Sequence, residues 1–353
     1  MATIRDVARE AGVSIATVSR VFNESALVSA ETARAVREVA AQLHYWPNGV
    51  ARSLITNKTH ALGVLLPDIH GEFFSEVIRG ADLAARANGF HLLVSSSHAD
   101  SEALGDALRM MSGRIDGVAV MAPDIDAPAA IASFAQACPT VLLNPGQAVD
   151  QCDTISIANF QGAHDMTRHL LGLGHTLIAI VRGPEHNLDA VQRLQGYRAA
   201  LREAGIAAEP ALEFPGLFTE PSGYDAVQAI LREIPRPTAL FVANDHMAVG
   251  VVSALHDAGV HPPAGMAVAG FDDIAMARYL SPSLTTVRVN TALLGERAVE
   301  LLLRRQREPL GSARHHELLP TTLVVRGSCG ALQPDDLRLR RRASDRLPAG
   351  TEG

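Results

Sequence analysis

From Ala61 onward, short apolar runs alternate with amphipathic segments of helical spacing, and this alternation constrains the fold more than any other feature. The runs are short enough to be single strands, and they read ALGVLLP, FHLLVSSS, DGVAVMAP, TVLLN, TLIAIVRG, TALFVAND and MAVAGFDD. Helical segments separate them, for example residues 74–88, 161–173, 191–204 and 246–258. Continuous apolar strands that alternate with helices predict parallel sheets covered by helices on both faces.

The alternation continues to about residue 330 of a 353-residue chain, which is more than one doubly wound sheet comfortably carries. We therefore predict an α/β body of two doubly wound parallel-sheet lobes that divide near residue 160. The last segment, residues 331–353, is polar and Arg-rich with no periodic apolar face. Such a composition predicts a disordered tail.

The first residues predict two short helices joined by a tight turn. Thr3 and Asp6 form a capping pair that can begin a helix. Gly12 ends that helix, because glycine readily adopts the left-handed conformation found after a helix C-terminus. Ser14 can cap a second helix, which runs from Ile15 to about residue 22.

A helix, a glycine turn and a second helix have the spacing of a helix-turn-helix, whose second helix enters the major groove of DNA. The same pattern also fits a plain helical hairpin without DNA contacts. A third helix is predicted from after Ser29 to about His44, and Pro47 and Asn48 then separate it from a further short helix. The charge distribution slightly favours a DNA-binding head: residues 1–58 carry seven Lys or Arg and five Asp or Glu, against 24 and 33 in the remainder.

The sequence gives no sign of export or membrane insertion. Its first residues, MATIRDVAREAGVS, contain no apolar leader, and no uncharged stretch of 18 apolar residues occurs. Cys138, Cys152 and Cys329 are scattered and odd in number, which favours reduced thiols over a disulfide framework. We therefore expect a cytoplasmic protein without a membrane partner.

The head resembles the lactose-repressor (LacI/GalR) family nearly position for position. The matching groups are Asp6-Val7-Ala8, Ala11-Gly12-Val13-Ser14, Thr17-Val18-Ser19-Arg20-Val21, Asn23, Val28-Ser29, Thr32, Arg34 and Pro47-Asn48. The resemblance continues to about Gly327. It implies a small all-α helix-turn-helix head followed by a body like a periplasmic sugar-binding protein.

The domain boundaries follow from this resemblance together with the strand pattern. We predict a DNA-binding domain at residues 1–47, a hinge helix and linker at 48–60, and an effector-binding body at 61–330. The first lobe would contain residues 61–160 and 291–320. The second lobe would contain residues 161–290 and 321–330, so that three chain crossings join the two.

The start of the second helix carries the residues that, by resemblance, choose the operator sequence. Ile15 and Ala16 are apolar and can contact thymine methyl groups, although Ile15 can instead pack on its own domain. Arg20 can pair with a guanine edge or bind a phosphate. Short polar side chains suited to phosphate oxygens complete the predicted DNA face, namely Thr17, Ser19 and Asn23.

The segment NGVARSL resembles the family's hinge helix, which enters the minor groove beside that of a second copy. Leu54 would be the apolar wedge that kinks the duplex. Val50 and Ala51 would pack on the partner copy or the groove floor, and Arg52 would meet a phosphate. Alternatively, Leu54 packs onto the body.

The resemblance also implies an effector site at the carboxyl ends of the strands, between the lobes. The candidate side chains follow strand ends or begin helices, and they are Phe73, Phe74, Asn144, Asn187, Asp189, Arg193, Phe218, Asn244 and Asp272. Arg193 is the strongest single candidate, because a buried guanidinium needs a fixed partner and a ligand oxygen can provide one.

Polar amide, carboxylate and guanidinium groups around aromatic faces suit a sugar or sugar derivative, and a nucleoside or purine could use the same set. Phe73 is favoured over Phe74, which can equally belong to a helix core. We predict that Asp245 is a helix N-cap rather than a ligand contact. Val289 stands where relatives often have glutamine, so the ligand of those relatives cannot simply be assigned to this chain.

Together these features predict a sequence-specific DNA-binding transcription regulator, most simply a repressor. It would bind a pseudo-palindromic operator as a homodimer, and a small-molecule effector would control its DNA affinity. A nucleoside- or purine-responsive regulator of the same family is the alternative. A second alternative is a sugar-binding protein that does not bind DNA, but this alternative does not explain the predicted helix-turn-helix head.

The sequence argues against an enzyme. No Gly-x-Gly-x-x-Gly turn follows a predicted strand, as a dehydrogenase would require, and the only lysine, Lys58, follows Asn57 rather than the glycine of a P-loop. His315 and His316 lack the spacing of metal ligands. We therefore expect no cofactor and no metal.

Overall fold

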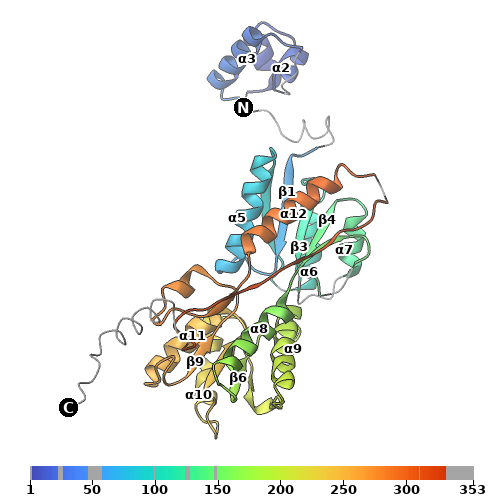
Figure 1. Cartoon of the computed structure of the whole chain (residues 1–353). Helices are drawn as coiled ribbons and strands as arrows, with labels where there is room; N and C mark the ends of the chain where they lie inside the picture. Colours follow the sequence, from blue (N-terminus) through green and yellow to red (C-terminus); the bar gives the residue numbers. More distant parts are fainter. Residues whose placement is uncertain are drawn as a thin grey trace, which may run out of the picture. The chain divides into compact units, whose positions relative to one another are not determined.

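The computed structural model describes residues 2–22, 27–46, 58–98, 100–123, 128–146, 149–309 and 311–330. The chain divides into two compact units, Met1–His60 and Ala61–Gly353, and each is described by itself (Figure 1). No helix in the described ranges is long and apolar enough to cross a membrane.

The head contains three helices, α1 (Ile4–Glu10), α2 (Ile15–Phe22) and α3 (Ala30–Gln42). Thr3 and Asp6 form the predicted capping box at the start of α1, and Gly12 has a φ of 65° in the turn that follows. The Ser14 hydroxyl accepts a hydrogen bond from the Thr17 amide at 3.1 Å and so caps α2. The predicted first two helices and their caps are confirmed.

The third helix is shorter than predicted. It ends at Gln42 rather than near His44, whose φ of 49° is incompatible with helix. Buried apolar side chains from all three helices form the core of the head, namely Val7, Ala8, Val18, Val21, Val36 and Ala40. The predicted helix after Asn48 lies outside the described residues.

The larger lobe of the body is built on a six-stranded parallel sheet of order β11-β5-β4-β3-β1-β2. Its strands are β1 (Ala61–Leu66), β2 (His91–Ser96), β3 (Val118–Met121), β4 (Thr140–Leu143), β5 (Asp153–Ile157) and β11 (His316–Leu319). Its helices are α5 (Glu72–Ala87), α6 (Ser101–Met111), α7 (Pro128–Ala135) and α12 (Thr291–Arg305).

Helices α5 and α12 lie side by side on this sheet, and glycines allow their close approach (Figure 1). A Cβ atom on Gly80 of α5 would overlap the backbone carbonyl of Ala292, and one on Gly295 of α12 would overlap that of Val77. Any larger residue at either position would push the helices apart.

The smaller lobe has a four-stranded parallel sheet of order β7-β6-β8-β9. Its strands are β6 (Ile178–Val181), β7 (Glu213–Phe214), β8 (Ala239–Val242) and β9 (Ala267–Ala269). Its helices are α8 (Asn159–Gly172), α9 (Leu188–Glu203), α10 (Glu220–Ile230), α11 (Asp245–Asp257) and the short 3-10 turns η1 (Pro210–Leu212) and η2 (Ala275–Arg278). The predicted fold class, a helix-turn-helix head and a body of two α/β lobes, is confirmed.

The chain passes between the lobes after β5, after β10 (Thr286–Arg288) and before β12 (Thr322–Val324). Strands β10 and β12 pair antiparallel, so two of the crossings are hydrogen-bonded to each other. The last crossing is the red segment of Figure 1.

Strand β2 departs from the prediction that every strand is covered on both faces. It is one of the two edge strands of its sheet, and Leu93 and Val94 are each 41 % exposed. Part of the apolar run FHLLVSSS is therefore exposed on the surface, and only part of it packs inside the lobe.

Candidate functional site

A cavity of about 490 Å³ lies between the two lobes, at the carboxyl ends of the strands. Eight of the nine predicted effector residues are among the described residues that line it, and they are Phe73, Phe74, Asn187, Asp189, Arg193, Phe218, Asn244 and Asp272. Asn144 is not in the lining. The cavity is large enough for a ligand of one or two sugar rings.

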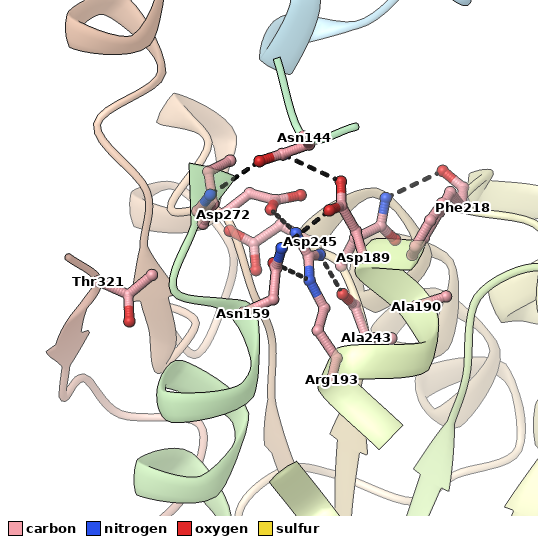
Figure 2. A network of polar contacts seen from close by, with 12 residues as sticks. Asn144, Asn159, Asp189, Ala190, Arg193, Phe218, Ala243, Asp245, Asp272 and Thr321 are labelled. Atoms are coloured by element: carbon pink, nitrogen blue, oxygen red, sulfur yellow. Dashed lines mark hydrogen bonds and ion pairs between the residues drawn. The ribbon is translucent and has the colours of Figure 1, made fainter. Parts of the chain in front are cut away.

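Arg193 projects from α9 into the centre of a polar network (Figure 2). Its Nε donates to Asn159 Oδ1 at 2.9 Å, its Nη1 donates to the Ala243 carbonyl at 2.5 Å, and its Nη2 lies 3.1 Å from Asp272 Oδ1. The Phe271 ring lies 3.8 Å from the guanidinium carbon. The residue is 3 % exposed, so the protein itself supplies the fixed partners that a buried guanidinium needs.

Asn187 and Asp189 begin α9. Asn187 is its N-cap, accepting a hydrogen bond from the Ala190 amide at 3.0 Å, and Asp189 lies in the first turn. Asp189 Oδ1 accepts from Asn159 Nδ2 at 2.9 Å, and its Oδ2 accepts from Asn144 Nδ2 at 3.2 Å.

Asn144, predicted as a ligand contact, instead connects the two lobes. It follows β4, has a φ of 44°, and accepts the Ile157 amide on its Oδ1 at 2.8 Å while its Nδ2 reaches Asp189 of the smaller lobe. Its side chain is almost fully buried. A second contact between the lobes is the hydrogen bond from the Ala275 amide to Glu72 Oε1 at 2.8 Å.

The prediction for Asp245 is wrong. Asn244 is the N-cap of α11, because its backbone is extended and its Oδ1 accepts the Met247 amide at 3.0 Å. Asp245 is fully buried, where it accepts from Thr286 Oγ1 at 2.7 Å and from the Ile274 amide at 3.1 Å. Burial, and then the neighbouring charge of Asp272, raise the pKa of Asp245 well above its usual value.

Asp272 lines the cavity with a side chain that is almost fully buried. Burial raises its pKa, and the positive charge of Arg193 opposes that rise. The contact from Arg193 to Oδ1 has the distance of an ion pair but not the geometry of a hydrogen bond, so this oxygen has no hydrogen-bond donor among the described residues.

Three histidines, His70, His98 and His246, also line the cavity and were missed by the sequence reasoning. His246 Nδ1 lies 2.6 Å from Glu220 Oε1, and because a carboxylate only accepts, Nδ1 carries the proton. Burial opposes the ionisation of Glu220, but the hydrogen bond from His246, a backbone hydrogen bond and the nearby imidazoles together outweigh burial and hold the pKa of Glu220 below its usual value. The only available signal was position: Glu220 and His246 each follow a predicted contact by two residues.

On the head, α2 presents Ile15 (46 % exposed), Ala16 and Arg20 to the surface, while Ser19 and Thr17 are half-buried. The Thr17 hydroxyl lies 2.9 Å from that of Ser14. The remaining predicted DNA contacts lie outside the described residues, and they are Asn23, Val50, Ala51, Arg52 and Leu54.

Two family models match the chain. "Bacterial regulatory proteins, lacI family" matches residues 3–48, and "Periplasmic binding protein-like domain" matches residues 167–329. The chain is 36 % identical to the ribose operon repressor of Escherichia coli (strain K12) over 330 residues, which cover 93 % of this chain and all of the relative. It is 34 % identical to the HTH-type transcriptional repressor PurR of Histophilus somni (strain 129Pt) over 337 residues, 94 % of this chain and all of that protein.

Solved structures give the same likeness. The lac repressor dimer bound to operator and the anti-inducer ONPF matches with a TM-score of 0.84 and 31 % identity, covering 94 % of this chain and 99 % of that one. A transcriptional regulator CelR–cellobiose complex matches with a TM-score of 0.70 and 30 % identity over 93 % of this chain and all of that one.

Proposed function

The chain belongs to the lacI family of bacterial regulatory proteins and is a DNA-binding transcriptional repressor with a small-molecule effector, and we propose that the effector is a sugar or sugar derivative bound in the cleft between the lobes. It is not an enzyme. We further propose that it acts in the cytoplasm as a homodimer on a pseudo-palindromic operator.

The observation that carries the effector proposal is the composition of the cleft. Phe73, Phe74 and Phe218 give it aromatic walls that can cover the C–H faces of a sugar ring, and Asp272 supplies a carboxylate that can pair with hydroxyls. Relatives named for ribose and complexed with cellobiose support this ligand class. A purine or nucleoside is the second candidate, because the same aromatic and polar groups can hold a nucleobase.

The DNA-contacting surface would be the exposed side of α2. Ile15 and Ala16 would meet base methyl groups, and Arg20 a guanine edge or a phosphate. Thr17 and Ser19 would bind phosphate oxygens. In the same proposal, Asn23 also binds phosphate, Leu54 wedges into the minor groove, and Val50, Ala51 and Arg52 complete the hinge contacts.

The dimer contact would use the uncovered surface at β2. Leu93 and Val94 on β2 and Leu83 on the adjoining helix α5 are large apolar side chains that are substantially exposed. Exposed apolar surface of this kind marks an interaction site, and a second copy of the chain is the partner that a two-fold operator requires. The dimeric state of the lac repressor in its operator complex supports this choice.

A selection experiment tests the proposed function. The purified full-length protein is mixed with fragments of its source genome at moderate salt, and the bound fragments are sequenced with and without added sugars. We expect enrichment of a two-fold symmetric site, and a sugar that changes the enrichment. Equal recovery of all fragments under every condition would contradict operator recognition.

A further inference from the structure

We infer that the cleft selects an effector that is uncharged or carries an amine, supplies at least two hydrogen-bond donors, and bears no phosphate or carboxylate. This inference rests on the proposed function, because it takes the cleft to be the effector site. It goes further by excluding sugar phosphates, nucleotides and sugar acids.

The first argument is the charge of the lining. Among the described residues that line the cavity, four side chains are carboxylates, Asp68, Asp189, Glu220 and Asp272, and a single guanidinium, Arg193, opposes them. An anionic ligand would therefore enter a cavity whose nearest charges are predominantly negative.

The second argument is that Arg193 already has protein partners for its charge and for its hydrogen-bond donors. Its charge is paired with Asp272 at 3.1 Å, its Nη1 and Nε donate to the Ala243 carbonyl and Asn159, and its face lies on the Phe271 ring. All of these contacts are made in a buried environment, where they are costly to break. An incoming anion could gain this guanidinium only by displacing Asp272, which would leave a buried carboxylate unpaired.

The third argument is independent of net charge. Asp272 Oδ1 and His246 Nε2 are two buried side-chain atoms of lining residues that receive no well-aligned hydrogen bond from the described residues, although Oδ1 lies 3.1 Å from Arg193 Nη2. Asp272 Oδ1 faces the Arg193 guanidinium, and a carboxylate oxygen paired in this way is a hydrogen-bond acceptor. The Nδ1 of His246 donates to Glu220, which leaves Nε2 as the ring nitrogen available to accept from a ligand.

Two buried acceptors without well-aligned donors are costly, and a ligand relieves that cost only by bringing donors. Two hydroxyls, or an ammonium group and a hydroxyl, can supply one donor to each atom. A fully ionised phosphate or carboxylate group offers only acceptors, so placed against these atoms it would leave them without donors and add repulsion. The cleft thus discriminates by hydrogen-bond polarity as well as by charge.

The test is a comparison of matched compounds at pH 8, using thermal shift and then calorimetry on the full-length protein. The pairs are D-ribose and D-ribose 5-phosphate, D-glucose and D-glucose 6-phosphate, cellobiose and cellobionate, and inosine and its monophosphate, with D-glucosamine added as the amine. We expect stabilisation by an uncharged or amine-bearing compound and at least about 100-fold weaker binding of its anionic counterpart.

The outcomes separate this inference from the function on which it rests. An anionic compound that binds as tightly as its uncharged counterpart, or more tightly, would overturn the inference while leaving effector sensing intact. If no compound of either kind raised the melting temperature, both the sugar-sensing function and this inference would fail.

Variants then test the acceptors with the compound identified. His246→Leu should weaken binding about tenfold, because it removes the acceptor Nε2. His256→Leu is the matched control: it lies on the exposed side of the same helix, outside the cavity, and should leave affinity unchanged. Equal effects of the two substitutions would contradict a ligand contact at His246.

Asp68→Asn tests the charge argument separately. Asp68 Oδ1 accepts the amides of Ile69 and His70, and asparagine can keep that turn while removing the negative charge. Discrimination against the phosphorylated counterpart should fall severalfold. Discrimination that stays constant in this variant would count against an electrostatic origin.

Discussion

Asp273 Oδ2 lies 2.6 Å from Arg288 Nε, so the residue after the cleft-lining Asp272 is ion-paired to crossing strand β10. Its other oxygen lies 2.5 Å from Arg326 Nη2, just beyond β12. The Asp273 side chain is almost fully buried, and its φ of 58° is one that few residues other than glycine adopt. Two adjacent aspartates thus connect the cleft with two of the chain crossings that join the lobes.

The Asp273→Asn variant should lower the free energy of unfolding by about 2 kcal/mol, since two guanidinium groups would then face a neutral amide. The loss is smaller than for a fully buried pair because Arg288 is half-exposed. Urea denaturation measures it. Asp106→Asn, which removes an exposed ion pair with Arg109 on α6, is the control and should change stability by less than about 0.5 kcal/mol. Similar losses for both variants would contradict a special role for Asp273.

Stability should depend on pH through Asp153. Burial opposes its ionisation, but hydrogen bonds from Arg305 and from the His315 amide outweigh it and lower its pKa. Because the folded pKa lies below the unfolded one, the stabilisation is complete above about pH 4 and is lost as pH falls through the folded value. The stability difference between the wild type and Asp153→Asn should therefore be large at pH 6 and shrink below about pH 4. A difference independent of pH would refute this assignment.

The contact between α5 and α12 should tolerate no side chain at Gly80. Gly80→Ala should cost about 2 kcal/mol, because the added methyl group overlaps the Ala292 carbonyl. Gly172→Ala makes the same chemical change at the end of α8, with no heavy atom within 4 Å, and should stabilise by about 0.5 kcal/mol. Opposite signs in thermal denaturation are the expected result, and equal signs would be inconsistent with the packing described.

The dimer proposal predicts that Leu93→Glu, on the edge strand β2, gives a folded monomer with weakened operator binding. Leu318 lies on β11, the opposite edge of the same sheet, and is 65 % exposed. Leu318→Glu should therefore leave the oligomeric state unchanged. Sedimentation velocity distinguishes the two variants, and a Leu93→Glu protein that still sediments as a dimer would rule out this surface.

Arg20→Ala separates the two roles left open for that side chain. If Arg20 pairs with a guanine, the variant loses discrimination at one base pair, by about 1–3 kcal/mol, with an unchanged salt dependence. If it binds a phosphate, affinity falls equally for all sequences and the slope of log affinity against log salt decreases by about one. Operator titrations at several salt concentrations measure both quantities, and a variant with neither change would remove Arg20 from the DNA face.

Local chemistry made much of the fold predictable. Thr3, Asp6, Gly12 and Ser14 act on their nearest neighbours in sequence, so the helix ends that they determine could be read directly. The alternation of strands and helices likewise gave the fold class. The sequence did not show that part of β2 is exposed, because that exposure depends on the position of β2 at the edge of the sheet.

The sequence predicted which residues lie at the cleft, but it did not predict the contacts between them. The family resemblance indicated Arg193 and Asp272, yet nothing in the sequence showed that the two pair with each other. Asn144 and Asp245 are equally polar strand-end residues, but they bond to distant segments, Asp189 in one case and Thr286 in the other, and neither lines the cavity. His246 and Glu220 were missed because their relation depends on two helices that meet only in the folded lobe.

The most direct test of the central claim is the operator affinity of the full-length protein, measured by fluorescence anisotropy with and without a saturating concentration of a compound shown to bind the cleft. Coupled sites should change operator affinity at least about fivefold, in either direction, and Asp272→Asn should reduce that change. A compound that raises the melting temperature through the cleft but leaves operator affinity the same would contradict control of DNA binding by the effector.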